Sequence, residues 1–264
     1  MSAPGEFLEF SDTSDDAVDR LLAAAGQDWR AMGRARAVFR SWPGNVFWII
    51  VGVLVLALVV LIATRPDDAG RIVAAAIAGG FLFFVALIAG SGVLERHRVC
   101  EHGLVVGFRT KSSYTIPWST VDPGRVRVVR RSNLLGRLPG RTASSPHIRH
   151  GAASGTALAL NGLDTALGTW IPIPGLGGVT DAVRPGSRFR STPFVWWFLG
   201  GRHPEKLVRA IEDAMVADGY PAVGLADRAI SQGVTLRYNP GAWEPFPARA
   251  GVSTVVGVDG QPQP

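Results

Sequence analysis

The chain has 264 residues, enough for one large domain or two small ones. Hydrophobic residues make up 47% of the chain and charged residues only 18%, a skew that predicts that part of it lies outside water. The single cysteine, Cys100, excludes an intrachain disulfide framework and any site built from several cysteines.

The net charge of +6 is distributed unevenly along the chain. Residues 1–28 carry −6, residues 29–43 carry +4 and residues 94–150 carry +8. A basic band therefore flanks the most hydrophobic segments, behind an acidic N-terminal tip. This pattern suits the anionic inner leaflet of a membrane better than it suits nucleic acid, and no nucleic-acid partner is predicted.

Residues 1–43 are predicted to form an amphipathic N-terminal arm. Apolar residues recur at helical spacing at Val18, Leu22, Ala25, Trp29 and Met32. The arm is either a surface or partner-docking helix or a juxtamembrane segment that positions the chain. The second interpretation is favoured, because glycines within the pattern weaken the helix.

Residues 44–94 are predicted to form a transmembrane hairpin. No charged residue lies between Arg40 and Arg65, and none between Arg71 and Glu95. The predicted spans cover about 44–64 and 72–94, each long enough for the roughly 30 Å of a hydrocarbon core. Small residues four apart in the second span, at Ala75 and Gly79, Ala76 and Gly80, and Ala86 and Gly90, favour packing against the first helix over a dedicated dimer face.

The distribution of basic residues around this hairpin predicts its orientation. Arginine and lysine are frequent before and after it, whereas the turn contains only Arg65 and Arg71. The positive-inside rule then places both termini in the cytoplasm, in a multi-pass protein of the inner (plasma) membrane. The first apolar run begins after about forty residues and is too long for a signal peptide, so no cleavable signal is expected.

After the hairpin, alternating patterns and turn signals predict an α+β soluble domain over residues 95–220. An amphipathic helix is expected from Pro204 to Gly219. Long loops are expected over 132–153 and 174–191, and a largely disordered tail over 221–264, whose aromatics could dock on the domain. Seven candidate strands lie at 98–100, 104–109, 114–118, 125–129, 156–160, 169–173 and 194–199.

Three short stretches in this order support a resemblance: Arg98-Val99-Cys100-Glu101-His102-Gly103-Leu104, then Thr115-Ile116-Pro117-Trp118, then the helix after Arg202-His203-Pro204. The chain resembles bacterial, actinobacterial-type membrane proteins that carry a pleckstrin-homology-like (PH-like) domain after a transmembrane hairpin. The resemblance implies a seven-stranded half-open barrel with a C-terminal helix, and a binding or assembly role without chemistry. The tight acidic turn at Glu101 departs from lipid-binding members of the wider family, which hold inositol phosphates with a basic loop.

The residues that could support chemistry do not form a recognisable site. His147 and His150 have the spacing of metal ligands but no carboxylate or cysteine near them in sequence. His97 and His102 flank Cys100, yet side chains at such strand positions diverge. The glycines after Pro174 lack the ending of a phosphate-binding loop. We therefore expect no catalytic residue, no metal and no cofactor.

The preferred interpretation is a non-enzymatic, membrane-anchored PH-like module that binds a protein partner or its own copy. The alternative is a sensor of anionic lipid headgroups, and a less favoured one is a membrane enzyme of unassigned activity. The candidate lipid or partner contacts are the basic residues Arg125, Arg127, Arg130, Arg131, Arg137 and Arg141.

Overall fold

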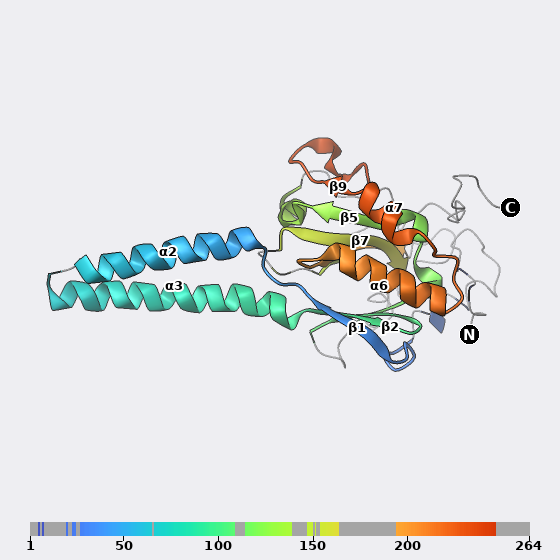
Figure 1. Ribbon diagram of the computed structural model, residues 1–264, viewed down its shortest axis with the longest axis horizontal. Helices are drawn as coiled ribbons and strands as arrows, with labels where there is room; N and C mark the ends of the chain where they lie inside the picture. The colour runs from blue at the N-terminus through green and yellow to red at the C-terminus, as the bar shows by residue number, and fades with distance from the viewer. Residues whose placement is uncertain are drawn as a thin grey trace, which may run out of the picture.

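The computed structural model describes residues 5, 7, 20, 23–24, 27–64, 66–108, 114–138, 147–149, 151, 154–163 and 194–246. It consists of a long helical hairpin and a β-rich domain with helices on one side (Figure 1). The mixed α and β composition of the region after the hairpin agrees with the fold class predicted from the sequence.

The hairpin is formed by α2 (Asn45–Thr64) and α3 (Asp68–Leu94), both long and apolar enough to cross a membrane. The second helix begins earlier than the predicted span, because the Asp67 side chain accepts a hydrogen bond from the Gly70 N–H at 2.5 Å and caps the helix. The expected packing of the small residues on the first helix is not observed. A Cβ atom built at Gly79, Gly80 or Gly90 would meet nothing within 4 Å.

The first sheet is antiparallel, with the strand order β1-β2-β3-β4. It contains β1 (Ala35–Arg40), β2 (Arg96–Cys100), β3 (Gly103–Gly107) and β4 (Tyr114–Pro117). Strand β1 falls in the segment that the sequence analysis assigned to the N-terminal arm, and it pairs along its length with β2. The hairpin is therefore inserted between two neighbouring strands of one sheet.

The predicted N-terminal helix lies mostly outside the described residues. Arg20, Ala23 and Ala24 are helical, whereas residues 29–32, at the end of the predicted stripe, form a turn that packs on the sheet. Met32 is fully buried, and its carbonyl accepts a hydrogen bond from the His102 N–H at 3.0 Å. Trp29 packs against the same small cluster, which contains Cys100 and Val105. Met32 and Trp29 of the arm thus cover part of the outer face of the first sheet.

The second sheet contains β6 (His147–Arg149), β8 (Phe194–Gly200), β7 (Thr156–Leu163), β5 (Arg127–Arg130) and β9 (Val234–Thr235), in that order. The described strands thus form two sheets, and no closed barrel is present among them. Part of the predicted 132–153 loop is structured, as the 3-10 helix Ser132–Arg137 and strand β6. The predicted strand at 169–173 and the loop at 174–191 lie outside the described residues.

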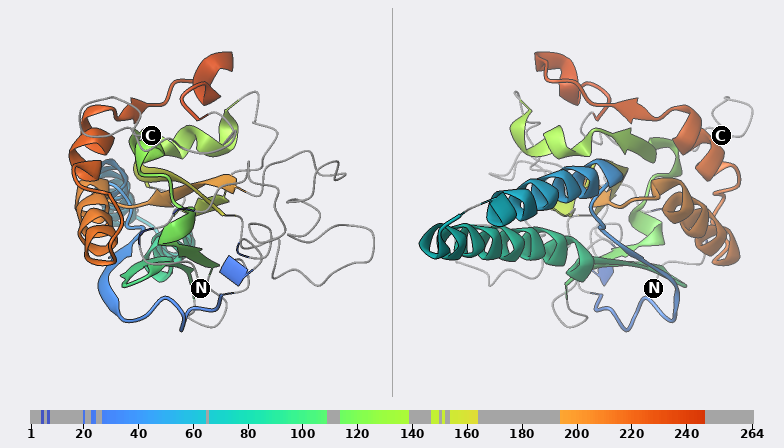
Figure 2. Two further views of the ribbon diagram at one scale, coloured as in Figure 1. Left: turned by 90° about the vertical axis from the view of Figure 1, so that its right-hand side faces the viewer. Right: turned by 60° about the vertical axis from the view of Figure 1, so that its left-hand side comes forward.

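The main core lies between the two sheets and under helix α6 (Pro204–Ala217). Trp118 and Trp197 are fully buried there, together with Val208 and Ile211 of the helix. Helix α7 (Leu225–Ser231) lies beside α6 (Figure 2), and the Glu212 carboxylate of α6 accepts hydrogen bonds from the first N–H groups of α7. The predicted amphipathic helix after Arg202 is therefore present.

The chain beyond residue 220 differs from the predicted largely disordered tail, as far as residue 246. Residues 234–246 cover the other face of the second sheet, where Trp243 and Phe246 pack against Trp196 and Phe198. Phe246 is fully buried, whereas Tyr238 is 70% exposed. Docked aromatic side chains hold this segment, which contains β9 and the 3-10 helix Pro240–Trp243, against the domain. Residues 247–264 lie outside the described part of the chain.

Candidate binding site at the base of the hairpin

The two ends of the helical hairpin join the β domain at a closely packed junction. The Gly151 N–H donates a hydrogen bond to the Ser41 hydroxyl at 2.9 Å. A Cβ atom at Gly151 would lie 2.7 Å from the Cα of Gly92 and 2.9 Å from the Ser41 carbonyl oxygen. Because three backbone segments meet here without room for a methyl group, the hairpin is held firmly against the domain.

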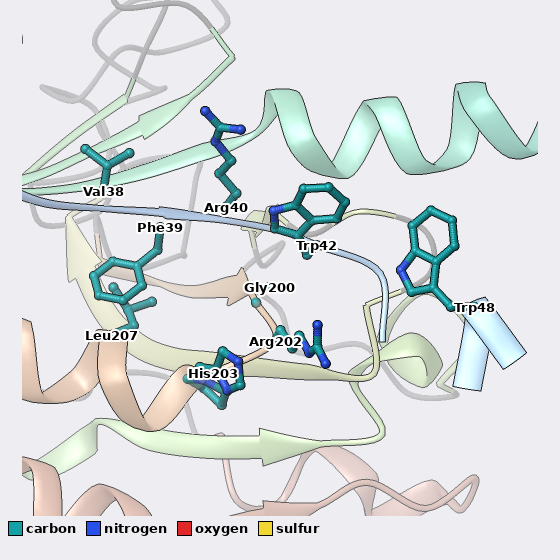
Figure 3. Close-up of a pocket in the computed structure, with 11 residues that line it drawn as sticks. Val38, Phe39, Arg40, Trp42, Trp48, Gly200, Arg202, His203 and Leu207 are labelled. Carbon is teal, nitrogen blue, oxygen red and sulfur yellow. The ribbon is translucent and has the colours of Figure 1, made fainter. Parts of the chain in front are cut away.

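A pocket of about 580 Å³ opens beside this junction. Its walls come from the end of β1, the first turn of α2 and the connection between β8 and α6, segments far apart in the sequence (Figure 3). The Gly201 backbone at its floor is fixed to the second sheet, because its N–H donates to the Thr156 carbonyl at 3.1 Å and its carbonyl accepts from the Thr156 hydroxyl at 2.5 Å.

One part of the pocket is apolar. Phe39 points toward Leu207 and His203, whereas Val38 and Arg40 point to the other side of β1 (Figure 3). Trp42 and Trp48 border the pocket on the hairpin side and are 42% and 40% exposed. These rings offer a large apolar surface that the fold leaves uncovered.

The other part of the pocket is positive. Arg202 and His203 lie at the start of α6, whose first residue is Pro204. His203 is the N-cap residue of α6, and its side chain makes no capping hydrogen bond. The helix dipole gives this end of α6 a partial positive charge, which favours an anion, although Pro204 has no N–H and the N–H groups of Lys206 and Leu207 donate to the His203 carbonyl.

The charged or polar side chains among the described residues that line the pocket are Arg40, Arg202 and His203. The described residues that line it carry no carboxylate, hydroxyl or thiol side chain. Among the described residues, no three His, Cys, Asp or Glu side chains lie close enough together to share a metal ion. The arrangement suits an amphipathic ligand whose anionic end meets Arg202 and whose apolar end lies against the tryptophans.

Two of the arginines predicted to contact lipid or a partner interact with groups of the domain itself instead. Arg125 forms an ion pair at 3.2 Å with Asp122, whose carboxylate is buried. Arg127 donates to the Val126 carbonyl at 2.8 Å. Burial lowers the pKa of Arg127, an effect that Asp122 opposes and that the neighbouring cations Arg228 and Arg125 reinforce. Arg125, at the end of the 3-10 helix Pro123–Arg125, and Arg127, the first residue of β5, are partly buried in the packing of the domain rather than on an open contact surface.

Three others lie at the opposite end of β5, on the side from which the hairpin emerges (Figure 1). Arg130, Arg131 and Arg137 are exposed there. The 3-10 helix that ends at Arg137 is tied to this end of the domain, because the Ser132 N–H donates to the Gly155 carbonyl at 3.1 Å. Arg141 lies outside the described residues. The five described arginines of the prediction therefore do not form one site.

His97 and Cys100 of β2, and His102 in the turn after it, take part in contacts that hold the domain together. Burial raises the pKa of the Cys100 thiol, the opposite of what an activated thiolate needs. His97 is fully buried, and its Nε2 lies 2.8 Å from the Gly200 carbonyl, a contact that joins the two sheets. His102 lies 2.8 Å from the Asp218 carboxylate at the end of α6.

Comparison with known proteins does not identify a relative. No protein-family model, no curated protein and no solved structure matched the chain. The function is therefore argued from the hairpin, the junction and the pocket alone.

Proposed function

We propose that this protein is a non-enzymatic, membrane-anchored binding module with a PH-like domain at the cytoplasmic face, and that its ligand site is the junction pocket. The observation that carries the proposal is the position of this amphipathic pocket at the base of two apolar helices. A ligand that partitions into the membrane interface would meet the pocket directly.

The membrane part of the proposal rests on the helices themselves. None of the α2 residues is buried, and only Ala74, Val85 and Gly92 of α3 are buried. So much exposed apolar surface is favourable in lipid and costly in water. Trp42 and Trp48 lie near the start of α2, where tryptophan is enriched at membrane interfaces. The basic residues around the hairpin base favour the cytoplasmic side.

The PH-like part of the proposal is supported by the arrangement of the domain. Two sheets enclose a core that helix α6 covers, and this helix follows the last long strand, β8. This order agrees with the half-open barrel and C-terminal helix that the sequence resemblance implies. Inserting the hairpin between β1 and β2 would fix the height of the domain above the bilayer.

A second candidate function is direct contact of the domain with anionic headgroups. Arg130, Arg131 and Arg137 favour it, because they are exposed at the end of the domain that carries the hairpin. Each basic residue near an anionic surface contributes about 1 kcal/mol of attraction, which salt screens. In this case the arginines would orient the domain, whereas the pocket would select the ligand.

The pocket can be tested by filling it. A Cβ atom at Gly201 would lie 3.7 Å from the Arg40 carbonyl oxygen, an ordinary contact, so the backbone tolerates Gly201→Leu while the side chain occupies the pocket. Gly136→Leu is the matched control, because a Cβ atom there meets nothing within 4 Å. Gly136 does not line the pocket.

Mass spectrometry of the gently purified full-length protein would measure the membrane lipids that remain bound. We expect the wild type and Gly136→Leu to retain about one equivalent of an amphipathic ligand and Gly201→Leu to lose it. Equal retention by all three proteins would reject the pocket as the ligand site.

A further inference from the structure

A second cationic feature lies on the opposite face of β1 and β2. Alternation in β2 directs His97 and Val99 into the domain, where both are fully buried. Arg96 and Arg98 therefore point to the outer face of the sheet. Arg40 is directly opposite Arg96 in the strand register and points away from Phe39, to the same outer face (Figure 3).

This arrangement is unfavourable for the protein alone. Like charges directly opposite each other on neighbouring strands destabilise a sheet, and their Cβ atoms lie only about 5 Å apart. Among the described residues, no ion pair joins a carboxylate to Arg40, Arg96 or Arg98. Of the nearby carboxylates, Glu101 accepts from the Arg34 N–H at 2.9 Å, and Glu95, whose Oε1 is buried without a hydrogen-bond partner, forms no ion pair with these arginines.

Two guanidinium nitrogens of this cluster are buried without a hydrogen-bond partner. They are Nε of Arg96 and one terminal nitrogen of Arg98. Burial lowers the pKa of Arg98, and the neighbouring charge of Arg96 lowers it further. Buried donors of a charged group that lack acceptors cost free energy, so an anion that supplied oxygens at this position would be stabilised.

The position of the cluster along the chain indicates which anions it can reach. Arg40 lies five residues before the start of α2, and Arg96 two residues after the end of α3. At about 3.3 Å per strand residue, Arg98 lies only about 7 Å beyond Arg96. The headgroup region of one leaflet is of similar depth, roughly 5–7 Å.

We propose that Arg40, Arg96 and Arg98 form a binding site for the phosphate of an anionic phospholipid in the leaflet around the hairpin base. Guanidinium groups bind phosphate oxygens through paired N–H donors, and three of them around one phosphate would neutralise the repulsion between the strands. This inference rests on the membrane anchoring in the proposed function but not on the pocket, which Arg40 borders and which neither Arg96 nor Arg98 lines.

The test uses the full-length protein in a neutral detergent and follows its thermal unfolding while lipid is added. A ligand that binds only the folded protein raises Tm with its concentration. We expect phosphatidylglycerol to raise Tm in a saturable manner and phosphatidylcholine to leave it unchanged. Inorganic phosphate and glycerol 3-phosphate form a separate arm that detects a soluble phosphate ligand.

The variants separate a specific site from general charge attraction. Arg96→Gln and Arg98→Gln should each weaken the phosphatidylglycerol effect at least tenfold, because each removes charged hydrogen bonds to the phosphate. Without lipid their Tm should stay the same or rise, since the repulsion between arginines is relieved. Arg36→Gln is the matched control: it makes the same charge change on β1, at an exposed position about 13 Å along the strand from Arg40.

Arg40→Gln provides a third test at an exposed position, where folding is least at risk. An equal effect of phosphatidylcholine would overturn the proposal, as would an equal loss in Arg36→Gln. A shift produced equally well by glycerol 3-phosphate would overturn the lipid source and assign the site to a soluble phosphate. Because neither Arg96 nor Arg98 lines the pocket, the results for their variants are independent of lipid retention by Gly201→Leu, so failure of this site and failure of the pocket can be distinguished.

Discussion

Gly92 and Gly90 lie two residues apart near the end of α3, yet the structure predicts opposite effects of adding a methyl group to them. A Cβ atom at Gly90 would meet nothing within 4 Å, whereas one at Gly92 would overlap the Ser41 carbonyl oxygen and approach the Cα of Gly151. Alanine in place of glycine within a helix gains about 0.5–1 kcal/mol. Gly90→Ala should therefore be neutral or slightly stabilising.

Gly92→Ala gains the same helix stabilisation, but its methyl group fits only if the backbone at the junction shifts. Overpacking of this kind costs about 1–3 kcal/mol, and here the obstacle is backbone rather than a flexible side chain. The two variants should therefore differ by roughly 1–3 kcal/mol, or roughly 3–10 °C in Tm for a protein of this size. Thermal unfolding of the full-length protein in detergent, followed by circular dichroism, measures the difference. Equal Tm values for Gly90→Ala and Gly92→Ala would refute the packed junction.

Other predictions concern the C-terminal segment, the Glu95 carboxyl and the domain boundary. Phe246→Ala should destabilise the protein by about 3–5 kcal/mol in denaturant unfolding, because the ring is fully buried, whereas Tyr238→Ala, at an exposed position, should have little effect. Burial raises the pKa of the Glu95 carboxyl above 4.5, and the charge of Arg149 opposes this shift. The folded state therefore holds the carboxyl proton more tightly than the unfolded state, and the free energy of unfolding falls as pH rises through the raised pKa. Glu95→Gln should therefore be more stable than the wild type at neutral pH, with the difference shrinking as pH falls toward 4.5; a difference that grows on acidification would contradict this assignment. A fragment of residues 94–220 should aggregate rather than fold, since it lacks β1 and the aromatics that cover Trp196; a soluble fragment with a cooperative unfolding transition would show that these segments are dispensable.

The features that the sequence predicted depend on local patterns. The two long apolar helices follow from uninterrupted runs without charge, and α6 follows from one apolar face that begins with Pro204 and ends before Gly219. The mixed strands after Glu95 were visible as alternation. Each of these patterns is contained within a few turns or one strand, so no knowledge of distant partners was needed.

The features that the sequence did not predict depend on distant contacts. The alternation of Ala37 and Phe39 with arginines is typical of a strand, but its partner β2 lies beyond the whole hairpin. The pocket joins Trp42 and Trp48 to Arg202 and His203, more than 150 residues away. The prolines and glycines after residue 220 suggested disorder, because aromatic docking leaves no periodic pattern.

The account depends most on the hairpin crossing a membrane with the β domain on the cytoplasmic side. Single cysteines in a full-length Cys100→Ala background, probed in intact cells with a membrane-impermeant thiol reagent, test this directly. Ala69→Cys, near the tip of the hairpin, should be labelled in intact cells. Val223→Cys, which is 62% exposed on the β domain, should be labelled only after the membrane is permeabilised. Labelling of Val223→Cys in intact cells, or of neither site until permeabilisation, would contradict the proposed anchoring and orientation.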